Sequence, residues 1–321
     1  MQKSRGEVDY LRISVTDRCQ LRCLYCMPPE GVPRLEHREI LRFEEIARVV
    51  WVAAARGFRR FRLTGGEPLL RRDVSALVRL LAAVPGVEDL SLTTNGCLLA
   101  REAAPLKEAG LRRLNVSLDA LDPGLYRRLT RGGDVGLVLA GLEAARRLGF
   151  APIKLNAVIV AGVNESEILP LADFARRRGF IVRFIELMPV LGSGSRPAPG
   201  FLSGERVRRI IGARYPLEEA SGIEGGGPAR YWRSGDLTVG FISPLTCDTC
   251  RSCRRLRLTA AGGLRTCLFS EEESDLKTAL RSGAGDGEIA RMLDAAVAAK
   301  PVRHMVSSPD SGSIRMSAIG G

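Results

Sequence analysis

Six short β-type runs alternate with amphipathic helical stretches along the chain between residues 11 and 187. The β-type runs cover residues 11–15, 61–64, 89–94, 114–118, 153–160 and 181–187. The helical stretches lie near residues 44–56, 73–83, 99–109, 136–148 and 167–178. Such alternation is typical of parallel strands joined by crossover helices. Six units are too few for a full eight-unit barrel, so the pattern predicts an α/β fold: an incomplete (β/α)6 TIM-like barrel that is open at the side.

The alternation stops at a glycine- and proline-rich segment, GSGSRPAPG, at residues 192–200. The chain beyond it reads differently, with helices expected near 203–212 and 287–299 and short strands near 237–242 and 255–259. We therefore predict two domains, a partial barrel over residues 1–195 and a C-terminal extension over residues 196–321.

Composition places the chain among globular proteins but says little about its chemistry. The 321 residues are 45% hydrophobic, which is enough to bury a large core. The sequence has no apolar run of membrane-spanning length and no apolar signal-peptide core, so we expect a cytoplasmic protein that does not bind a membrane. The formal charge is +12, but the arginines are scattered through helical stretches, as at 146–147 and 176–178, which argues against nucleic acid. Such a field still suits a polyanionic nucleotide.

Three cysteines, Cys19, Cys23 and Cys26, follow the first β-type run with the spacing CxxxCxxC. They offer an iron–sulfur cluster three of its usual four thiolates, which leaves one iron open to a small molecule. The alternative is that three cysteines fall by chance in one loop of a reduced protein. Of the eight cysteines only Cys97 stands apart from such groups, as expected for a small buried apolar residue.

Other chemically distinctive residues also follow the predicted strands. They are Gly65-Gly66-Glu67-Pro68 after the second strand, Thr93-Thr94-Asn95-Gly96 at the third, Ser117 and Asp119 at the fourth, and Met188 after the sixth. Each segment alone could be a turn, a helix start or a core filler. Because the carboxyl ends of parallel strands share one face of a barrel, together they predict a single site.

The CxxxCxxC motif with Tyr25 before its third cysteine, followed by GGEP after the next strand, resembles the radical S-adenosylmethionine (SAM) superfamily. The resemblance implies a [4Fe-4S] cluster on Cys19, Cys23 and Cys26, whose free iron chelates SAM and whose electron generates a 5′-deoxyadenosyl radical. It further implies SAM contacts at Tyr25, Gly66, Ser117 and Met188. We interpret Gly66 as the residue that lets the backbone approach the methionine part of SAM closely.

A second group, Cys250, Cys253 and Cys267, has the spacing CxxC-x13-C. With the segments LRISVTDRC, LNVSLDAL, RFIELMP, RLRLTAAG and the closing Gly320-Gly321, it resembles the GTP 3′,8-cyclase family of molybdenum-cofactor biosynthesis. The resemblance implies a second [4Fe-4S] cluster whose open iron binds the guanine of GTP. Hydrogen is then removed from ribose C3′, and C3′ attacks C8 of the base. The implied GTP contacts are Arg12, Arg62, Thr93, Lys154, Arg255, Leu256 and Arg257.

The same resemblance implies further partners and a role for the chain end. Gly320-Gly321 would enter the active site, so deleting the pair is expected to abolish cyclisation without loss of folding or clusters. A reductant protein would donate electrons, the product would pass to cyclic pyranopterin monophosphate synthase, and the enzyme, a lyase, would be a monomer or homodimer.

Two positions depart from the family pattern and keep alternatives open. Arg254 stands where asparagine is common, and Cys247 adds a fourth thiol that could close a zinc site or cap the second cluster. One rival function is a different radical enzyme acting on a peptide or another nucleotide. The other is a noncatalytic module that uses zinc and basic residues to bind RNA. About eight irons per chain would exclude the zinc version.

Overall fold

A computed structural model describes residues 8–188, 200–225, 227–247, 250, 253–270 and 272–301. Its strands form one twelve-stranded sheet in the order β12-β11-β10-β1-β2-β3-β4-β5-β6-β9-β8-β7. The strands of the barrel half are β1 (Tyr10–Ser14), β2 (Arg60–Thr64), β3 (Asp89–Thr94), β4 (Arg113–Ser117), β5 (Ile153–Ile159) and β6 (Ile181–Glu186). Those of the C-terminal half are β7 (Glu218–Ala220), β8 (Arg230–Ser234), β9 (Leu237–Ile242), β10 (Arg255–Leu258), β11 (Gly263–Arg265) and β12 (Ser274–Asp275).

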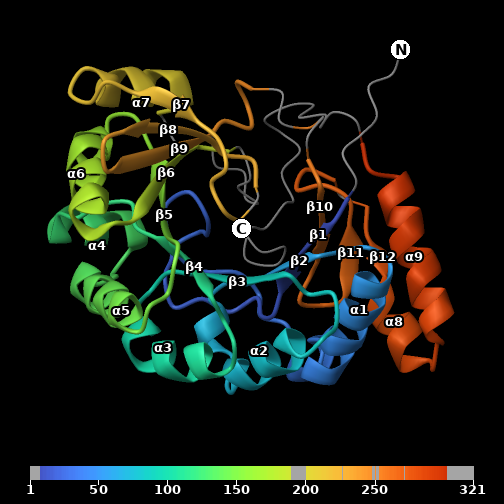
Figure 1. Cartoon of the computed structure of the whole chain (residues 1–321). Helices are drawn as coiled ribbons and strands as arrows, with labels where there is room; N and C mark the ends of the chain where they lie inside the picture. Colours follow the sequence, from blue (N-terminus) through green and yellow to red (C-terminus); the bar gives the residue numbers. More distant parts are fainter. Residues whose placement is uncertain are drawn as a thin grey trace, which may run out of the picture.

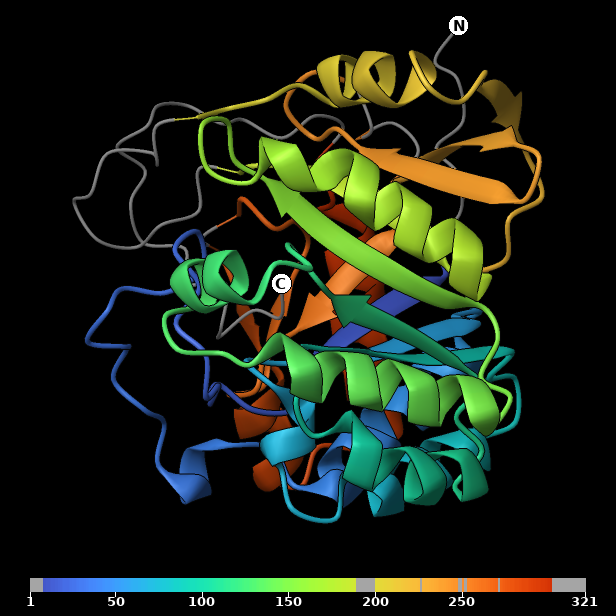
Figure 2. The same cartoon turned by 90° about the vertical axis from the view of Figure 1, so that its left-hand side faces the viewer.

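The helices cover the outer side of the curved sheet (Figures 1 and 2). They are α1 (Phe43–Ala55), α2 (Val74–Ala82), α3 (Leu99–Glu108), α4 (Pro123–Thr130), α5 (Val135–Arg147), α6 (Ile168–Arg178), α7 (Gly204–Gly212), α8 (Leu276–Arg281) and α9 (Asp286–Ala298). The last of these packs beside α1, where Arg48 pairs with Asp286 and Arg56 with Asp294. None of the helices that the structure describes is long and apolar enough to cross a membrane.

The predicted partial barrel is confirmed, since β1 to β6 pair in parallel and in chain order. The short helix α4 was not predicted, although Asp122 caps it and Pro123 begins it. The C-terminal half does more than follow the barrel. Its β10 pairs in parallel with β1, and its β9 pairs in parallel with β6, so it extends the sheet at both ends. The division at residue 195/196 stays a prediction.

Alternation along the strands sorts side chains between the core and the barrel interior. On β1, Leu11 and Ile13 pack in the hydrophobic core beneath the helices, whereas Arg12 lines an interior cavity. On β6, Arg183 lines the same cavity between two core residues. Because successive side chains of a strand point to opposite faces, an apolar outer face leaves the inner face free for charged residues. The polar interior thus follows from the strand pattern.

Candidate active site

The first cysteine group lines a pocket at the carboxyl ends of the strands. Cys19, Cys23 and Cys26 share this pocket with all four residues predicted to contact SAM, which are Tyr25, Gly66, Ser117 and Met188. The cysteine loop is anchored to the end of α4, because the N–H groups of Arg22 and Leu24 donate to carbonyls of that helix. The side chain of Arg131 adds a hydrogen bond to the Met27 carbonyl at 2.7 Å.

The GGEP turn docks directly on the cysteine loop. The Gly66 N–H donates to the Thr16 carbonyl at 2.7 Å, and the Glu67 N–H to the Arg18 carbonyl at 2.7 Å. A Cβ on Gly66 would lie 2.3 Å from the Arg18 carbonyl oxygen. That clash adds a second physical reason to the one expected from the sequence: close packing of two backbone segments of the protein requires glycine here.

Glu67 ties the GGEP turn to the TTNG segment. Its side chain is 1% exposed and accepts hydrogen bonds from the Leu69 N–H, the Thr94 hydroxyl and the Asn95 N–H. Burial raises the pKa of Glu67 to about 7, although these donors act in the opposite direction. The Asn95 amide in turn lies 3.8 Å from the Cys19 sulfur. The segments at the ends of β2 and β3 therefore hold the cysteine loop that follows β1.

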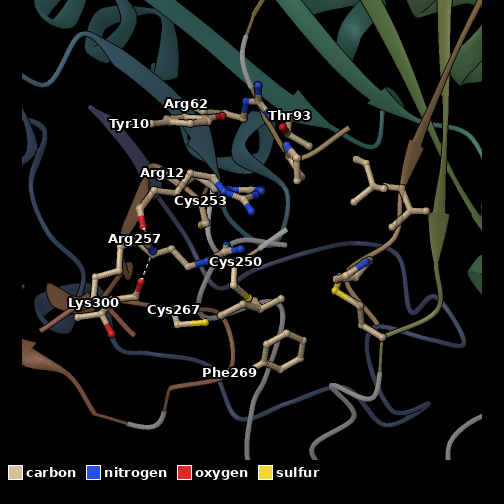
Figure 3. A pocket seen from close by; sticks show the side chains of 18 of the residues that line it. Tyr10, Arg12, Arg62, Thr93, Cys250, Cys253, Arg257, Cys267, Phe269 and Lys300 are labelled. Carbon is tan, nitrogen blue, oxygen red and sulfur yellow. Dashed lines mark hydrogen bonds between the residues drawn. The ribbon is translucent and has the colours of Figure 1, made fainter. Parts of the chain in front are cut away.

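The second cysteine group lines a neighbouring pocket with a strongly cationic wall (Figure 3). Its lining residues include Cys250, Cys253, Cys267, Tyr10, Arg12, Arg62, Thr93, Arg255, Arg257 and Lys300. Burial alone would raise the pKa of Cys253, but Arg255 and Lys300 nearby lower it to about 6. By contrast, burial and the neighbouring thiol of Cys19 raise the pKa of Cys26 to about 12. Cys253 and Cys26 therefore lie in electrostatically opposite surroundings.

The two pockets meet at four shared lining residues, Thr93, Asn156, Ile185 and Met188. The Thr93 hydroxyl oxygen is buried there, and none of the described residues supplies it with a hydrogen-bond partner. A buried polar atom left in this way costs free energy unless a bound molecule satisfies it. The junction thus fits a small polar ligand that reaches from one pocket toward the other.

Each cysteine triad supplies three thiolates, the donor set of a four-iron cluster with one iron left open. Across the described part of the chain, no three Cys, His, Asp or Glu side chains are grouped as one metal ion would need. In a four-iron cluster each thiolate takes a different iron, so the sulfurs stand farther apart than around one ion. Cys247, the extra thiol, is exposed and lines a separate pocket with Trp232 and Arg208. Arg254 forms an ion pair with Asp9 at 2.8 Å.

Three of the predicted GTP-site features are placed differently from the rest. Leu256 packs in the core behind β10 and does not line the pocket. Lys154 lies beside the pocket, where its ammonium donates to the Glu224 carbonyl and to the Tyr231 hydroxyl. Gly320-Gly321 lie outside the described residues.

Arg183 and Lys300 also line the second pocket and were not predicted. Arg183 is 2% exposed and donates to the side-chain oxygens of Asn115 and Asn156. Burial lowers its pKa to about 10. A lone arginine in an apolar strand was the available signal. The Lys300 ammonium donates to the carbonyls of Arg255 and Thr266, which places a cation behind the second cysteine group.

Comparison with known proteins identifies the family to which the chain belongs. The radical SAM superfamily model matches residues 13–175, and a model described as Molybdenum Cofactor Synthesis C matches residues 180–306. Among solved structures, Streptococcus suis SuiB bound to S-adenosylmethionine has a TM-score of 0.63 at 15% identity, covering 88% of this chain and 68% of that chain. SuiB bound to its precursor peptide has a TM-score of 0.54 at 18% identity, covering 64% and 45%. The chain belongs to the radical SAM superfamily.

The similarity to curated relatives is closer. The chain is 49% identical to GTP 3′,8-cyclase of Pelotomaculum thermopropionicum, over 98% of each protein. It is 45% identical to GTP 3′,8-cyclase 1 of Pseudomonas aeruginosa, over 94% of this chain and 92% of the relative. Within the superfamily it therefore belongs to the GTP 3′,8-cyclase family, and its cofactors are SAM and [4Fe-4S] clusters.

Proposed function

We propose that this protein is a GTP 3′,8-cyclase that converts GTP to (8S)-3′,8-cyclo-7,8-dihydroguanosine 5′-triphosphate in molybdenum-cofactor biosynthesis. The observation that carries the proposal is the junction between the two cysteine-lined pockets at Thr93, Asn156, Ile185 and Met188. A radical formed in one pocket has to reach a substrate carbon in the other without meeting water. Two adjoining pockets that share lining residues bring the two reactants close together.

In the first pocket, Cys19, Cys23 and Cys26 hold one cluster, and Tyr25, Gly66, Ser117 and Met188 surround SAM. When bound, the reduced cluster and SAM supply the radical that removes a hydrogen atom from the ribose. The protein's own contribution is to hold this loop rigidly. The hydrogen bonds of the GGEP turn to Thr16 and Arg18 do so, and those of Glu67 to the TTNG segment add to them.

In the second pocket, Cys250, Cys253 and Cys267 hold the other cluster, and the cationic wall binds the triphosphate. The guanidinium groups of Arg12, Arg62, Arg255 and Arg257 line the cavity, and arginine suits phosphate oxygens because it donates in a planar fork. Buried Arg183 adds a further positive charge. Lys154 contributes through its charge from beside the cavity, and Leu256 only supports β10 from the core.

The finer assignments belong to the same proposal. The enzyme is of the lyase class and takes its electrons from a reductant protein, and its product passes to cyclic pyranopterin monophosphate synthase. We further propose a cytoplasmic location, a monomer or homodimer, and entry of Gly320-Gly321 into the active site.

Anaerobic incubation of the reconstituted protein with GTP, SAM and a reductant tests the proposal. Mass analysis should detect a cyclised triphosphate. It should form together with 5′-deoxyadenosine, and 5′-deoxyadenosine should form only when GTP is present. Cleavage of SAM that is indifferent to GTP, with GTP recovered unchanged, would contradict it. The iron content should be about eight per chain if both cysteine groups hold four-iron clusters.

A further inference from the structure

Glu186, the last residue of β6, is a buried carboxylate without a role in the reaction described above. Its side chain is 2% exposed and lines the pocket of the first cysteine group, called the SAM pocket from here on. Glu186 precedes Met188 of that pocket by two residues. It lies on the strand that β9 extends, where Ile185 is in register with Ile242. The carboxylate therefore stands beside the loop that leaves β9 and leads to Cys250.

Four donors surround this carboxylate. Its Oε1 accepts hydrogen bonds from the Gly204 N–H at 2.9 Å and from the Thr246 hydroxyl. Its Oε2 accepts from the N–H groups of Leu245 at 3.2 Å and Thr246 at 3.3 Å. An ionised carboxylate has about four lone-pair positions, so its acceptor capacity is filled by the protein itself. Glu186 is thus unsuited to contact SAM, although it lines that pocket.

The donors come from two segments that carry no strand of the barrel half. Gly204 begins α7, whose N-terminal end favours a negative charge. Leu245 and Thr246 belong to the turn Ser243–Cys247, which is closed by a hydrogen bond from the Cys247 N–H to the Ser243 carbonyl at 3.0 Å. The packing is tight, because a Cβ on Gly204 would lie 2.2 Å from the Ser243 hydroxyl.

We propose that Glu186 is a positioning residue that fixes the turn Ser243–Cys247 to the barrel and thereby holds the Cys250 side of the second pocket in place relative to the SAM pocket. Cys250 follows the turn by three residues, and Pro244 of the turn lines the second pocket. Hydrogen transfer from GTP to the radical formed from SAM requires the two molecules to lie close together. If the turn is loosened, SAM is still cleaved, but a smaller share of these cleavages converts GTP. Of the two measurements described below, hydrogen exchange and nucleotide product, only the second rests on the proposed function.

Glu186→Gln is the decisive variant. Glutamine keeps the shape of the side chain, but its amide nitrogen is a hydrogen-bond donor. This nitrogen replaces one of the two carboxylate oxygens and therefore faces groups that are donors themselves. The matched control is Glu205→Gln, which removes the same charge from the neighbouring exposed residue of α7, where it pairs with Arg208 at 2.9 Å. Both variants are compared with the unsubstituted protein after anaerobic reconstitution.

Hydrogen exchange of the peptide that contains residues 243–247 is the first readout. In Glu186→Gln the exchange should accelerate at least about tenfold, because charge-assisted hydrogen bonds are lost, while exchange in β1 to β5 and in the control stays unchanged. The second readout is the ratio of cyclised nucleotide to 5′-deoxyadenosine, which should fall about tenfold while SAM is still cleaved.

Unchanged exchange in Glu186→Gln would overturn the inference, as would an unchanged product ratio. Equal loss of SAM cleavage and nucleotide product would also overturn it, because Glu186 would then act within the SAM pocket alone. If the unsubstituted protein makes no cyclised nucleotide, the proposed function fails, and the exchange measurement still decides whether Glu186 holds the turn.

Discussion

The phenolic oxygen of Tyr25 lies 2.6 Å from Oδ2 of Asp119. The other oxygen of Asp119 accepts the Val158 N–H at 2.8 Å, and burial raises the pKa of the carboxyl group to about 6. The hydrogen bond between Tyr25 and Asp119 joins the cysteine loop to the end of the fourth barrel strand. It also fixes the ring of Tyr25 in the SAM pocket, so the aromatic face is set before SAM binds.

Tyr25→Phe should weaken SAM binding about tenfold while leaving the iron content unchanged, because a single hydrogen bond to a carboxylate is lost. Equilibrium dialysis of reconstituted protein measures the change. Tyr215→Phe is the matched control, since Tyr215 also donates to a carboxylate, that of Asp173, away from both pockets. An affinity within twofold of the unsubstituted protein would show that the hydroxyl does not orient the ring.

Gly66→Ala should displace the GGEP turn from the cysteine loop, since the added Cβ meets the Arg18 carbonyl oxygen at 2.3 Å. We expect iron to fall by about four per chain and SAM cleavage to be lost, because one four-iron cluster is no longer held. Gly287→Ala is the control. Its Cβ meets nothing within 4 Å inside α9, so the variant should gain up to about 1 kcal/mol of unfolding free energy. Full iron content in Gly66→Ala would contradict this account of the turn.

Arg183→Met should raise the Kd for GTP roughly ten- to hundredfold, because a buried cation contributes about 1.5–3 kcal/mol through each hydrogen bond to a phosphate. The melting temperature without GTP should also fall, because the side-chain oxygens of Asn115 and Asn156 lose their buried donor. The stabilisation conferred by GTP should be lost as well. Arg178→Met, at an exposed arginine paired with Glu143, should bind GTP normally. Normal GTP affinity in Arg183→Met would show that Arg183 does not contribute to GTP binding.

Lys154 should make GTP binding dependent on pH. Burial and the charges of Arg183 and Arg113 lower its pKa to about 7, so at pH 8 the free protein holds it mainly neutral. A bound triphosphate favours the ammonium form, so binding should take up as much as one proton at pH 8, and GTP affinity should fall as the pH rises above about 7. Calorimetry in two buffers with different protonation enthalpies measures the uptake.

Two variants separate the charge of Lys154 from its titration. Lys154→Met and Lys154→Arg should both abolish the dependence of the binding heat on the buffer, but only the methionine variant should lose affinity. Identical heats in both buffers for the unsubstituted protein would contradict the lowered pKa.

The barrel half of the fold was predictable because its strands are local patterns. The six runs match β1 to β6 to within one or two residues at each end. Pairing of β9 with β6 and of β10 with β1 was not predictable, since both depend on contacts between segments far apart in the chain. The exposed strands β7 and β8 lack the apolar alternation that would have indicated them.

The site was predictable as far as its motifs extend. The cysteine groups line the two cavities, as do Arg12 and Arg62, which strand alternation directs inward. The environment of Lys154 was not predictable, since its partners Glu224 and Tyr231 come from the C-terminal half. The packing constraint on Gly66 was not predictable for a similar reason: the Arg18 carbonyl that excludes a side chain belongs to another loop.

If the two pockets adjoin as proposed, the radical formed in the pocket of Cys19, Cys23 and Cys26 reaches ribose C3′ of GTP bound in the pocket of Cys250, Cys253 and Cys267. GTP that carries deuterium at C3′ tests this transfer. We expect 5′-deoxyadenosine to gain one deuterium for each cyclised triphosphate formed. Cyclised product accompanied by deuterium-free 5′-deoxyadenosine would contradict it.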